Sequence, residues 1–377
     1  MPEERSFVTI PEEQAPLEGD DTSNDEVDIR SPFDPSQIRV DTKTPTLDVL
    51  IRRMKNEEID MAPDFQRYGG VWRIEAESRL IESLLIKIPL PAFYFDASDD
   101  ERWLVVDGLQ RLTTIKKFVI DKSLQLKGLE FLHDYEGKCF DDLSRALQRR
   151  IEETSLVVYL IQPGTPHRVK FDIFKRINTG GQPLSAQEIR HALNQGKATV
   201  FLKELVEMDC FKQATAGSIP SKRMDDRECA LRFLAFSMTS PEQYDEDNFD
   251  LFLHQAMSRL NESSDEDLAQ LKTRFQLAME TAYKLFENDA FRKRFDWEAG
   301  RSQINKALFE SWSVNLGALN SDEVKRLIER QNDLKRRFIN LMHNKPFESA
   351  ITQGTGSVKR VRMRFEQIGL IIQETLQ

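Results

Sequence analysis

The segment Trp103–Ile120 reads WLVVDGLQRLTTIKKFVI, and its hydrophobic period changes at Asp107-Gly108. The apolar run from Trp103 to Val106 is bounded by charged residues, which predicts a short buried strand. Beyond the glycine the large apolar residues recur at helical spacing, at Leu109, Leu112 and Ile115 and again from Phe118 to Ile120. The sequence therefore predicts a strand that turns directly into a helix.

The predicted turn offers a place where an anion could bind. The first backbone N–H groups of a helix have no partner inside the helix, and they attract negative charge. Beside them, Asp107 could hold Mg²⁺, Arg111 could grip a phosphate with two hydrogen bonds and Gln110 could orient water. Thr113 adds a hydroxyl on the same helix. These residues are equally compatible with an ordinary capped turn, so the spacing alone leaves both interpretations open.

A second polar segment follows a predicted helix at Val169–Ile177. This helix brings Arg176 to the loop Asn178–Pro183, where Gly180-Gly181 permits close backbone approach to a ligand. A glycine-rich turn before a helix is more often only a turn. On its own, this loop is therefore weak evidence for a binding site.

Other elements are predicted from hydrophobic periodicity. Thr46–Lys55 and Glu75–Lys87 show helical spacing of apolar residues, whereas Leu90–Phe95 and Leu156–Ile161 are apolar runs typical of strands. The pattern of Ser185–Glu188 is that of a capping box, which predicts the start of a further helix. Short strands and helices in this order predict an α+β unit.

Read with Phe65-Gln66-Arg67 and Val71-Trp72 upstream and Arg176–Gly181 downstream, the motif at Asp107–Arg111 resembles a known family. This is the family of the N-terminal domain of the GmrSD restriction enzyme, whose signature is DGQQR on a ParB/sulfiredoxin-like fold. Here the signature appears as DGLQR, with Leu109 in place of the first glutamine. If that glutamine contacts nucleotide, the change affects hydrolysis; if it packs inside the protein, little changes.

The resemblance implies a site for a nucleoside triphosphate and Mg²⁺, coupled to bacterial defence against phage DNA. It assigns catalytic roles to Asp107, Gln110 and Arg111, with Asp107 also on the metal. The nucleotide-binding residues it implies are Gln66, Arg67, Gly108, Thr113, Arg176, Asn178, Thr179 and Gly180. We therefore expect the groups at the turn to face the same pocket as those of the second polar segment. The base is not indicated.

Composition sets the general class of the protein. The chain has 377 residues, 40% of them hydrophobic and 31% charged, with a net charge of −10. Residues 1–34 hold eleven acidic side chains against Arg5 and Arg30, so the remainder of the chain is nearly neutral. The three cysteines have no metal-binding spacing and are interpreted as reduced thiols. Without a secretion signal or an apolar run of ~20 residues, we expect a cytoplasmic protein that does not enter the membrane.

Three parts are predicted along the chain. Residues 1–36 are acidic and rich in proline, which is typical of a disordered tail; a nucleic-acid mimic that occupies a basic groove is the alternative. Residues 37–215 form the ParB/sulfiredoxin-like nucleotide-binding domain. Residues 216–377 show almost only helical periodicity, which predicts a mainly α-helical C-terminal domain. The fold class is therefore α+β.

Two functional hypotheses follow. The first is a Mg²⁺-dependent NTPase component of an anti-phage or restriction-type system that acts on or senses DNA. The alternative is a nucleotide- or DNA-binding regulatory module without turnover, which controls a separate effector protein. Arg360, Arg362 and Arg364 could contact DNA phosphates, although a solvated helix face competes with this interpretation. A nuclease is not expected, because the five histidines are scattered singly and no HNH module is recognisable.

Overall fold

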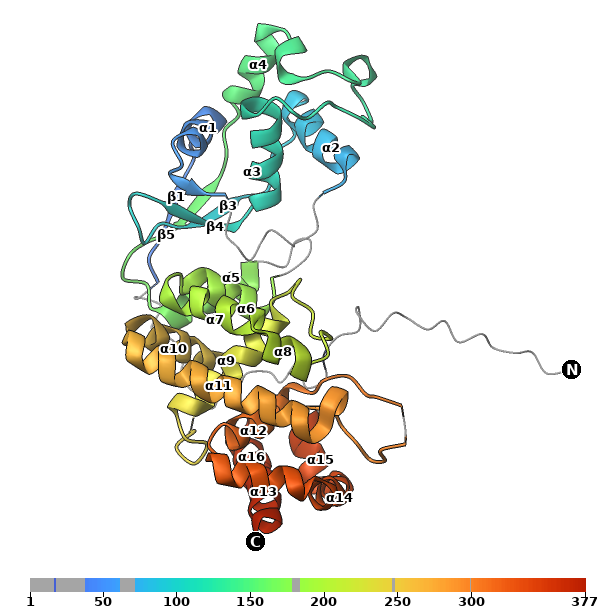
Figure 1. Ribbon diagram of the computed structural model, residues 1–377. Helices are drawn as coiled ribbons and strands as arrows, with labels where there is room; N and C mark the ends of the chain where they lie inside the picture. Colours follow the sequence, from blue (N-terminus) through green and yellow to red (C-terminus); the bar gives the residue numbers. More distant parts are fainter. Residues whose placement is uncertain (1–16, 18–37, 62–71, 178–183, 246–247, 299) are drawn as a thin grey trace, which may run out of the picture. The chain divides into compact units, whose positions relative to one another are not determined.

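The computed structural model describes Leu17 and residues 38–61, 72–177, 184–245, 248–298 and 300–377. The chain divides into an N-terminal unit within residues 29–193 and a C-terminal unit within residues 194–377 that also includes Leu17 (Figure 1). The predicted tail, residues 1–36, lies outside the described residues apart from Leu17, which is buried in the core of the C-terminal unit. None of the described helices combines the length and apolar character needed to cross a bilayer.

A mixed five-stranded sheet with the order β1-β5-β3-β4-β2 forms the centre of the N-terminal unit. The pairs β1–β5 and β3–β4 are antiparallel, whereas β3–β5 and β2–β4 are parallel. The strands are β1 (Val40–Lys43), β2 (Ile59–Asp60), β3 (Phe93–Asp96), β4 (Trp103–Asp107) and β5 (Val158–Ile161). The helices are α1 (Leu47–Lys55), α2 (Ile74–Leu85), α3 (Leu109–Ile115), α4 (Arg145–Glu152), α5 (His167–Ile177) and α6 (Ala186–Leu193).

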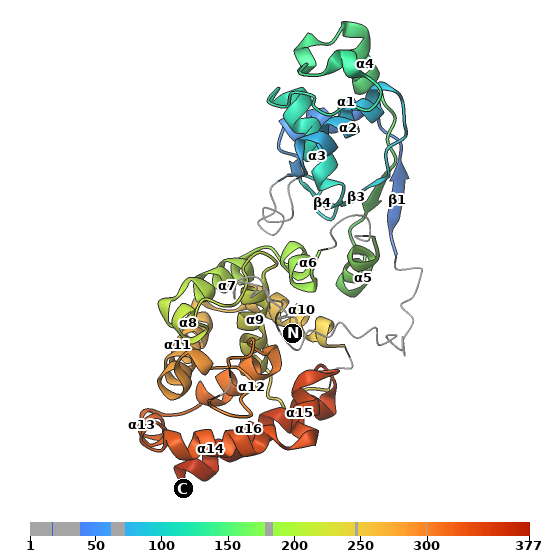
Figure 2. The same cartoon turned by 90° about the vertical axis from the view of Figure 1, so that its right-hand side faces the viewer.

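The side chains of β3 alternate between the two faces of the sheet, and different helices cover these two faces. Phe93 and Phe95 are buried in a core formed with α1, α2 and α3 on one face. Helix α5 lies on the other face in both views (Figures 1 and 2). There Lys170 of α5 forms a buried ion pair with Asp96 of β3, with 2.9 Å between Nζ and Oδ2. Because buried charges need partners, this pair fixes α5 against the sheet.

The C-terminal unit is mainly helical. Its apolar stripes meet in one core that includes Phe233, Phe275 and Trp312, as expected for amphipathic helices packed together. The helices are α7 (Lys197–Glu207), α8 (Asp209–Ala214), α9 (Asp225–Met238), α10 (Phe249–Glu262), α11 (Asp265–Phe286), α12 (Lys306–Leu316), α13 (Ser321–Glu329), α14 (Gln331–Met342), α15 (Lys345–Thr352) and α16 (Val358–Leu376).

A cluster of charged side chains is also buried in the C-terminal unit. Glu310 of α12 accepts a hydrogen bond from Arg364 of α16, with Nε 2.7 Å from Oε1. Its other oxygen accepts from Arg232 of α9 at 3.2 Å, and Arg232 also donates to Glu228 at 2.8 Å. The side chains of Arg364 and Glu310 are 0% exposed. The cluster therefore ties three helices together through charges that are almost completely buried.

The structure confirms the α+β class and several predicted elements. Helix α1 occupies the predicted segment almost residue for residue, and α2 ends two residues before the predicted limit. At α6, Ser185 N donates to Glu188 Oε2 at 2.6 Å, and Glu188 N donates to Ser185 Oγ at 3.1 Å. The capping box was correctly predicted because it depends only on local geometry.

The position of the domain boundary differs from the prediction. The sequence places it after residue 215, whereas the structure divides the chain after Leu193. Helices α7 and α8 belong to the C-terminal unit because they pack against α9 and α11. Phe201, Leu202 and Phe211 are accordingly buried in the core of that unit.

Candidate functional site

Gly108 determines the shape of the turn between β4 and α3. Its φ of 106° and ψ of 6° lie in the left-handed region that favours glycine. A Cβ at this position would lie 2.4 Å from Cδ1 of Phe93. The turn therefore requires glycine for two reasons, its backbone conformation and the close approach of the Phe93 ring.

The Arg111 guanidinium is largely buried and bonded to the protein. Nη2 donates to Asp107 Oδ2 at 3.0 Å and to the carbonyl of Ala92 at 3.1 Å. Nη1 donates to the carbonyl of Pro91, and the group lies 4.4 Å above the centre of the Phe93 ring. The residue is only 8% exposed. This geometry does not fit the predicted phosphate clamp, because the head is directed at protein acceptors; it holds the turn against the start of β3.

Asp107 keeps partial access to solvent, with 29% of its side chain exposed. Burial raises the pKa of its carboxyl, while the charge of Arg111 and the backbone N–H of Gly108 act in the opposite direction. Burial likewise lowers the pKa of Arg111, and Asp107 opposes that shift. The result is a partly desolvated carboxylate that is held by one oxygen and still reachable from outside.

Two tyrosines extend the site along the sheet, and the sequence reasoning missed them. Tyr94 of β3 pairs with Asp107 across the strands, and Tyr159 of β5 pairs with Tyr94. Their rings are stacked, with centroids 4.8 Å apart and planes 17° from parallel. Burial raises the pKa of Tyr94, and the nearby Tyr159 and Asp107 add to the effect. The signal was available, because each tyrosine alternates with buried apolar residues and so faces away from the core.

Gln110 and Thr113 lie on one side of α3, one turn apart, and both are half-buried. Their side chains therefore remain partly available to a ligand at the turn. Thr114 has a structural role instead, because its hydroxyl donates to the carbonyl of Gln110 at 2.9 Å. Helix α3 continues directly into a π-helical segment, Lys116–Ile120, so the helical stretch is longer than α3 alone.

The second predicted cluster is only partly within the described residues. Arg176 is exposed near the end of α5, the helix that lies on the same face of the sheet as Asp96. The other predicted ligands of this cluster, Asn178, Thr179 and Gly180, lie outside the described residues, as do Gln66 and Arg67 from the upstream segment. Their convergence on Asp107 stays a prediction.

A metal ion at this turn would bind the carboxylate of Asp107. Among the described residues no group of three His, Cys, Asp or Glu side chains could hold a metal. Mg²⁺ is commonly bound by one or two carboxylates together with substrate phosphates and water. Asp107 fits such a shared site, in which a nucleotide would supply further ligands.

The predicted DNA-contacting arginines do not form a common surface. Arg364 is fully buried, and besides its bond to Glu310 it donates to the carbonyl of Thr355 at 2.6 Å. Arg362 is exposed and donates to the carbonyl of Tyr244 at 3.1 Å. Arg360 is half-buried and donates to the carbonyl of Gln353. The prediction for Arg364 is wrong, because alternate residues of α16 point in different directions and this one enters the core.

The N-terminal unit is thus an α+β domain with its polar groups gathered at a strand-to-helix turn. Residues 48–194 match the family model described as GmrSD restriction endonuclease, N-terminal domain. This part of the chain is therefore a GmrSD N-terminal domain, as its DGLQR motif predicted, and the family indicates a restriction-related role. No curated protein and no solved structure matches the chain.

Proposed function

We propose that the chain is the nucleotide-binding component of a restriction-type defence system. Its N-terminal unit binds the phosphates of a nucleoside triphosphate at the turn between β4 and α3. The family match over residues 48–194 supports the defence role. The main observation in support of the nucleotide site is the position of Asp107. Its carboxylate is fixed by Arg111, yet its side chain is 29% exposed just before the start of α3.

Each group at the turn has a distinct part in this proposal. Asp107 would hold Mg²⁺, which neutralises phosphate charge when bound. The half-buried side chains of Gln110 and Thr113 would hydrogen-bond to phosphate oxygens or water. Arg111 acts as a positioning residue, because its Nη atoms are bonded to Asp107 and to two carbonyls of the protein.

The stacked tyrosines support a nucleotide rather than a free phosphate. Tyr94 and Tyr159 lie in the same cross-strand row as Asp107, and both are half-buried. Aromatic rings stabilise planar ligands through stacking and burial of apolar area. A base beside these rings would lie within reach of phosphates at Asp107.

Binding without turnover is the form of this function that the geometry favours. Phosphoryl transfer is accelerated by cations aimed at the transferring group, and the Arg111 head is directed at the protein instead. In this form the nucleotide sets a conformation that a separate effector protein reads, with DNA as the sensed partner. Hydrolysis is the second candidate, favoured by the half-buried amide of Gln110 one residue before Arg111.

Binding and phosphate release would be measured together to test the proposal. ATP, GTP, CTP and UTP would be titrated calorimetrically with Mg²⁺, and phosphate release would be followed with and without DNA. We expect one nucleotide to bind and Asp107→Asn to weaken it about tenfold or more. Asp100→Asn is the matched control, since Asp100 is exposed in the loop between β3 and β4.

The outcomes separate the candidates. Unchanged affinity in Asp107→Asn would contradict the site. Binding with no phosphate release selects the regulatory module, whereas release that depends on Gln110 selects the NTPase.

A further inference from the structure

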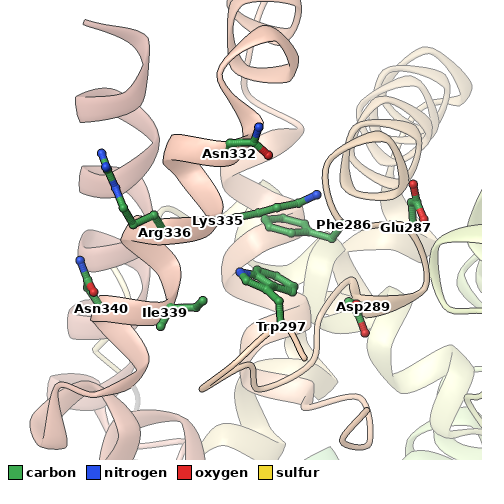
Figure 3. Close-up of a pocket in the computed structure, with 9 residues that line it drawn as sticks. All are labelled: Phe286, Glu287, Asp289, Trp297, Asn332, Lys335, Arg336, Ile339 and Asn340. Atoms are coloured by element: carbon green, nitrogen blue, oxygen red, sulfur yellow. The ribbon is translucent and has the colours of Figure 1, made fainter. Parts of the chain in front are cut away.

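The hollow between the end of α11 and helix α14 has a mixed lining (Figure 3). Its walls carry two acidic side chains, Glu287 and Asp289, and two basic ones, Lys335 and Arg336. Because these charges balance, the hollow favours neither an anion nor a cation. A surface with a more specific charge order lies in the N-terminal unit, at one edge of the sheet.

Strand β1 is the outermost strand of the sheet on that side (Figure 2). All four of its residues are exposed, and even the apolar Val40 is 38% exposed. Its inner side pairs with β5, and among the described residues no strand pairs with its outer side. An unpaired edge presents a row of backbone N–H and C=O groups to which a further strand can bind.

The bonds between β1 and β5 show which backbone groups point outward. The carbonyls of Arg39 and Pro45 accept hydrogen bonds from the β5 side of the ladder, at 2.8 Å and 2.9 Å. Backbone groups alternate in direction along an antiparallel strand, so the odd-numbered residues of this segment face β5. Val40, Thr42 and Thr44 therefore direct their N–H and C=O groups away from the sheet.

The charges on β1 distinguish between the ways in which a second copy of the strand could pair with it. If Thr42 lies opposite Thr42 in an antiparallel pair, Asp41 of each copy lies opposite Lys43 of the other. A shift by two residues in one direction places Asp41 opposite Asp41, and a shift in the other direction places Lys43 opposite Lys43. Opposite charges across a strand pair stabilise it and like charges destabilise it, so the first register is favoured.

The two charged side chains are free to make these contacts. Both are exposed, and Asp41 accepts a hydrogen bond from Gln162 Nε2 at one oxygen, Oδ2, over 3.0 Å. Lys43 has no ion-pair partner among the described residues. Charged residues on an exposed edge often serve only to prevent aggregation. Here their order does more than that, because it matches the same strand in reverse direction.

We propose that β1 pairs antiparallel with β1 of a second copy, about a two-fold axis at Thr42, and that the chain thereby forms a homodimer. Val40, Thr42 and Thr44 of the two copies would exchange about six backbone hydrogen bonds. A two-fold axis uses the same edge in both copies, so the assembly closes at the dimer.

The dimer would join the two candidate sites on one surface. Thr42 lies opposite Tyr159, Tyr159 opposite Tyr94, and Tyr94 opposite Asp107. Residues directly opposite each other share a face of the sheet, so pairing at Thr42 continues this row into the second copy on the same face. The two Asp107 carboxylates would lie roughly 30 Å apart. This consequence rests on the proposed nucleotide site, whereas the dimer itself does not.

Sedimentation velocity of the full chain tests the proposal, at concentrations from about 1 to 100 µM. An interface made by one short strand from each copy is small, so we expect a weak dimer that forms within this range. Thr42→Pro removes an outward N–H and leaves the bonds to β5 in place, and should abolish the dimer. Its melting temperature at the lowest concentration should be close to that of the natural chain.

Charge reversal tests the register. Asp41→Lys alone and Lys43→Asp alone each place like charges opposite one another, and should weaken self-association about tenfold or more. When the two variants are mixed in equal amounts, every charged pair is again of opposite sign, and a heterodimer should form. Asp100→Lys is the matched control, because Asp100 is exposed in the loop between β3 and β4 and should leave the dimer unchanged.

A monomer throughout the concentration range would overturn the proposal. So would a dimer that survives Thr42→Pro, single charge variants that associate as strongly as the natural chain, or a mixture of the two that stays monomeric.

Discussion

Each unit of the molecule contains an arginine bonded to a carboxylate in its interior, but the two pairs differ in access to water. In the C-terminal unit, Arg364 and Glu310 are both 0% exposed. In the N-terminal unit, 10% of the Arg111 side chain and 29% of the Asp107 side chain are exposed. A fully enclosed pair can only hold helices together. A pair at the edge of a sheet can hold a turn and still present its acid to a ligand.

The largest effect is expected from breaking the enclosed pair. Glu310→Ala leaves Arg364 and Arg232 without their shared carboxylate, and the free energy of unfolding should fall by about 3–5 kcal/mol. Urea denaturation measures it. Asp333→Ala is the control, because the ion pairs of Asp333 lie at the surface of α14 and should matter little. Similar losses in the two variants would remove the distinction between enclosed and exposed pairs.

The next effect concerns the turn that supports the exposed pair. Gly108→Ala forces a Cβ against the Phe93 ring at a φ of 106° and should destabilise the protein by about 2–3 kcal/mol. Nucleotide binding should be lost with it. Gly137→Ala is the matched control, since its φ is 74° but nothing lies within 4 Å of the added Cβ. We expect about 1 kcal/mol there and unchanged binding. Thermal melts of both variants decide whether the close approach matters.

A third test concerns Asp226, a half-buried acid in the first turn of α9. Burial raises the pKa of Asp226 from 3.8 to about 6, against the opposing charge of Arg227. The folded protein therefore binds this proton more tightly than the unfolded chain. The stabilising contribution is present below pH 4 or so and is lost as the pH rises through about 6, a change of up to about 3 kcal/mol.

Asp226→Asn should lack this dependence. Urea unfolding of both proteins between about pH 4 and 7 should show curves that diverge, with the natural chain losing stability relative to the variant as the pH rises. Parallel curves would show that Asp226 is charged in the folded protein throughout this range.

The smallest effect on stability is expected at the exposed pair itself. Arg111→Met removes three hydrogen bonds, but water can reach Asp107, so the loss should be about 1 kcal/mol. Nucleotide affinity should fall more than stability does, because the carboxylate is no longer positioned. The charge of Arg111 lowers the pKa of Asp107, so the carboxyl of the variant should take up its proton at a higher pH. As the pH is lowered, the variant should therefore lose nucleotide at a higher pH than the natural chain does. Calorimetric titration of nucleotide at several pH values measures both the loss of affinity and its pH dependence. An unchanged affinity would show that Arg111 does not position Asp107.

Local features of the fold were predictable from the sequence. The change of hydrophobic period located the junction between β4 and α3 at Asp107-Gly108, and Ser185 with Glu188 located the start of α6. The burial of Arg111 and Arg364 was not predictable, because most of the groups that hold them are distant in sequence. Arg111 is held by carbonyls about twenty residues upstream, and Arg364 by a carboxylate more than fifty residues away. Spacing along one helix carries no information about such contacts.

The candidate site shows the same division. The turn at Asp107 and Gly108 was identified from its own residues, whereas the tyrosine pair arises from strands that meet only in the folded sheet. The boundary between the units was misplaced because the helicity of α7 and α8 does not reveal which core they join.

The Phe93 ring makes the effects of substitutions at positions 108 and 111 depend on each other. It occupies the space that a side chain at position 108 would need, and it is also the surface on which the Arg111 guanidinium rests. A smaller residue at 93 would make room at 108 but leave the guanidinium without support. A viable sequence that abandons the glycine must therefore change all three positions together, so this turn should drift more slowly in evolution than the strands beside it.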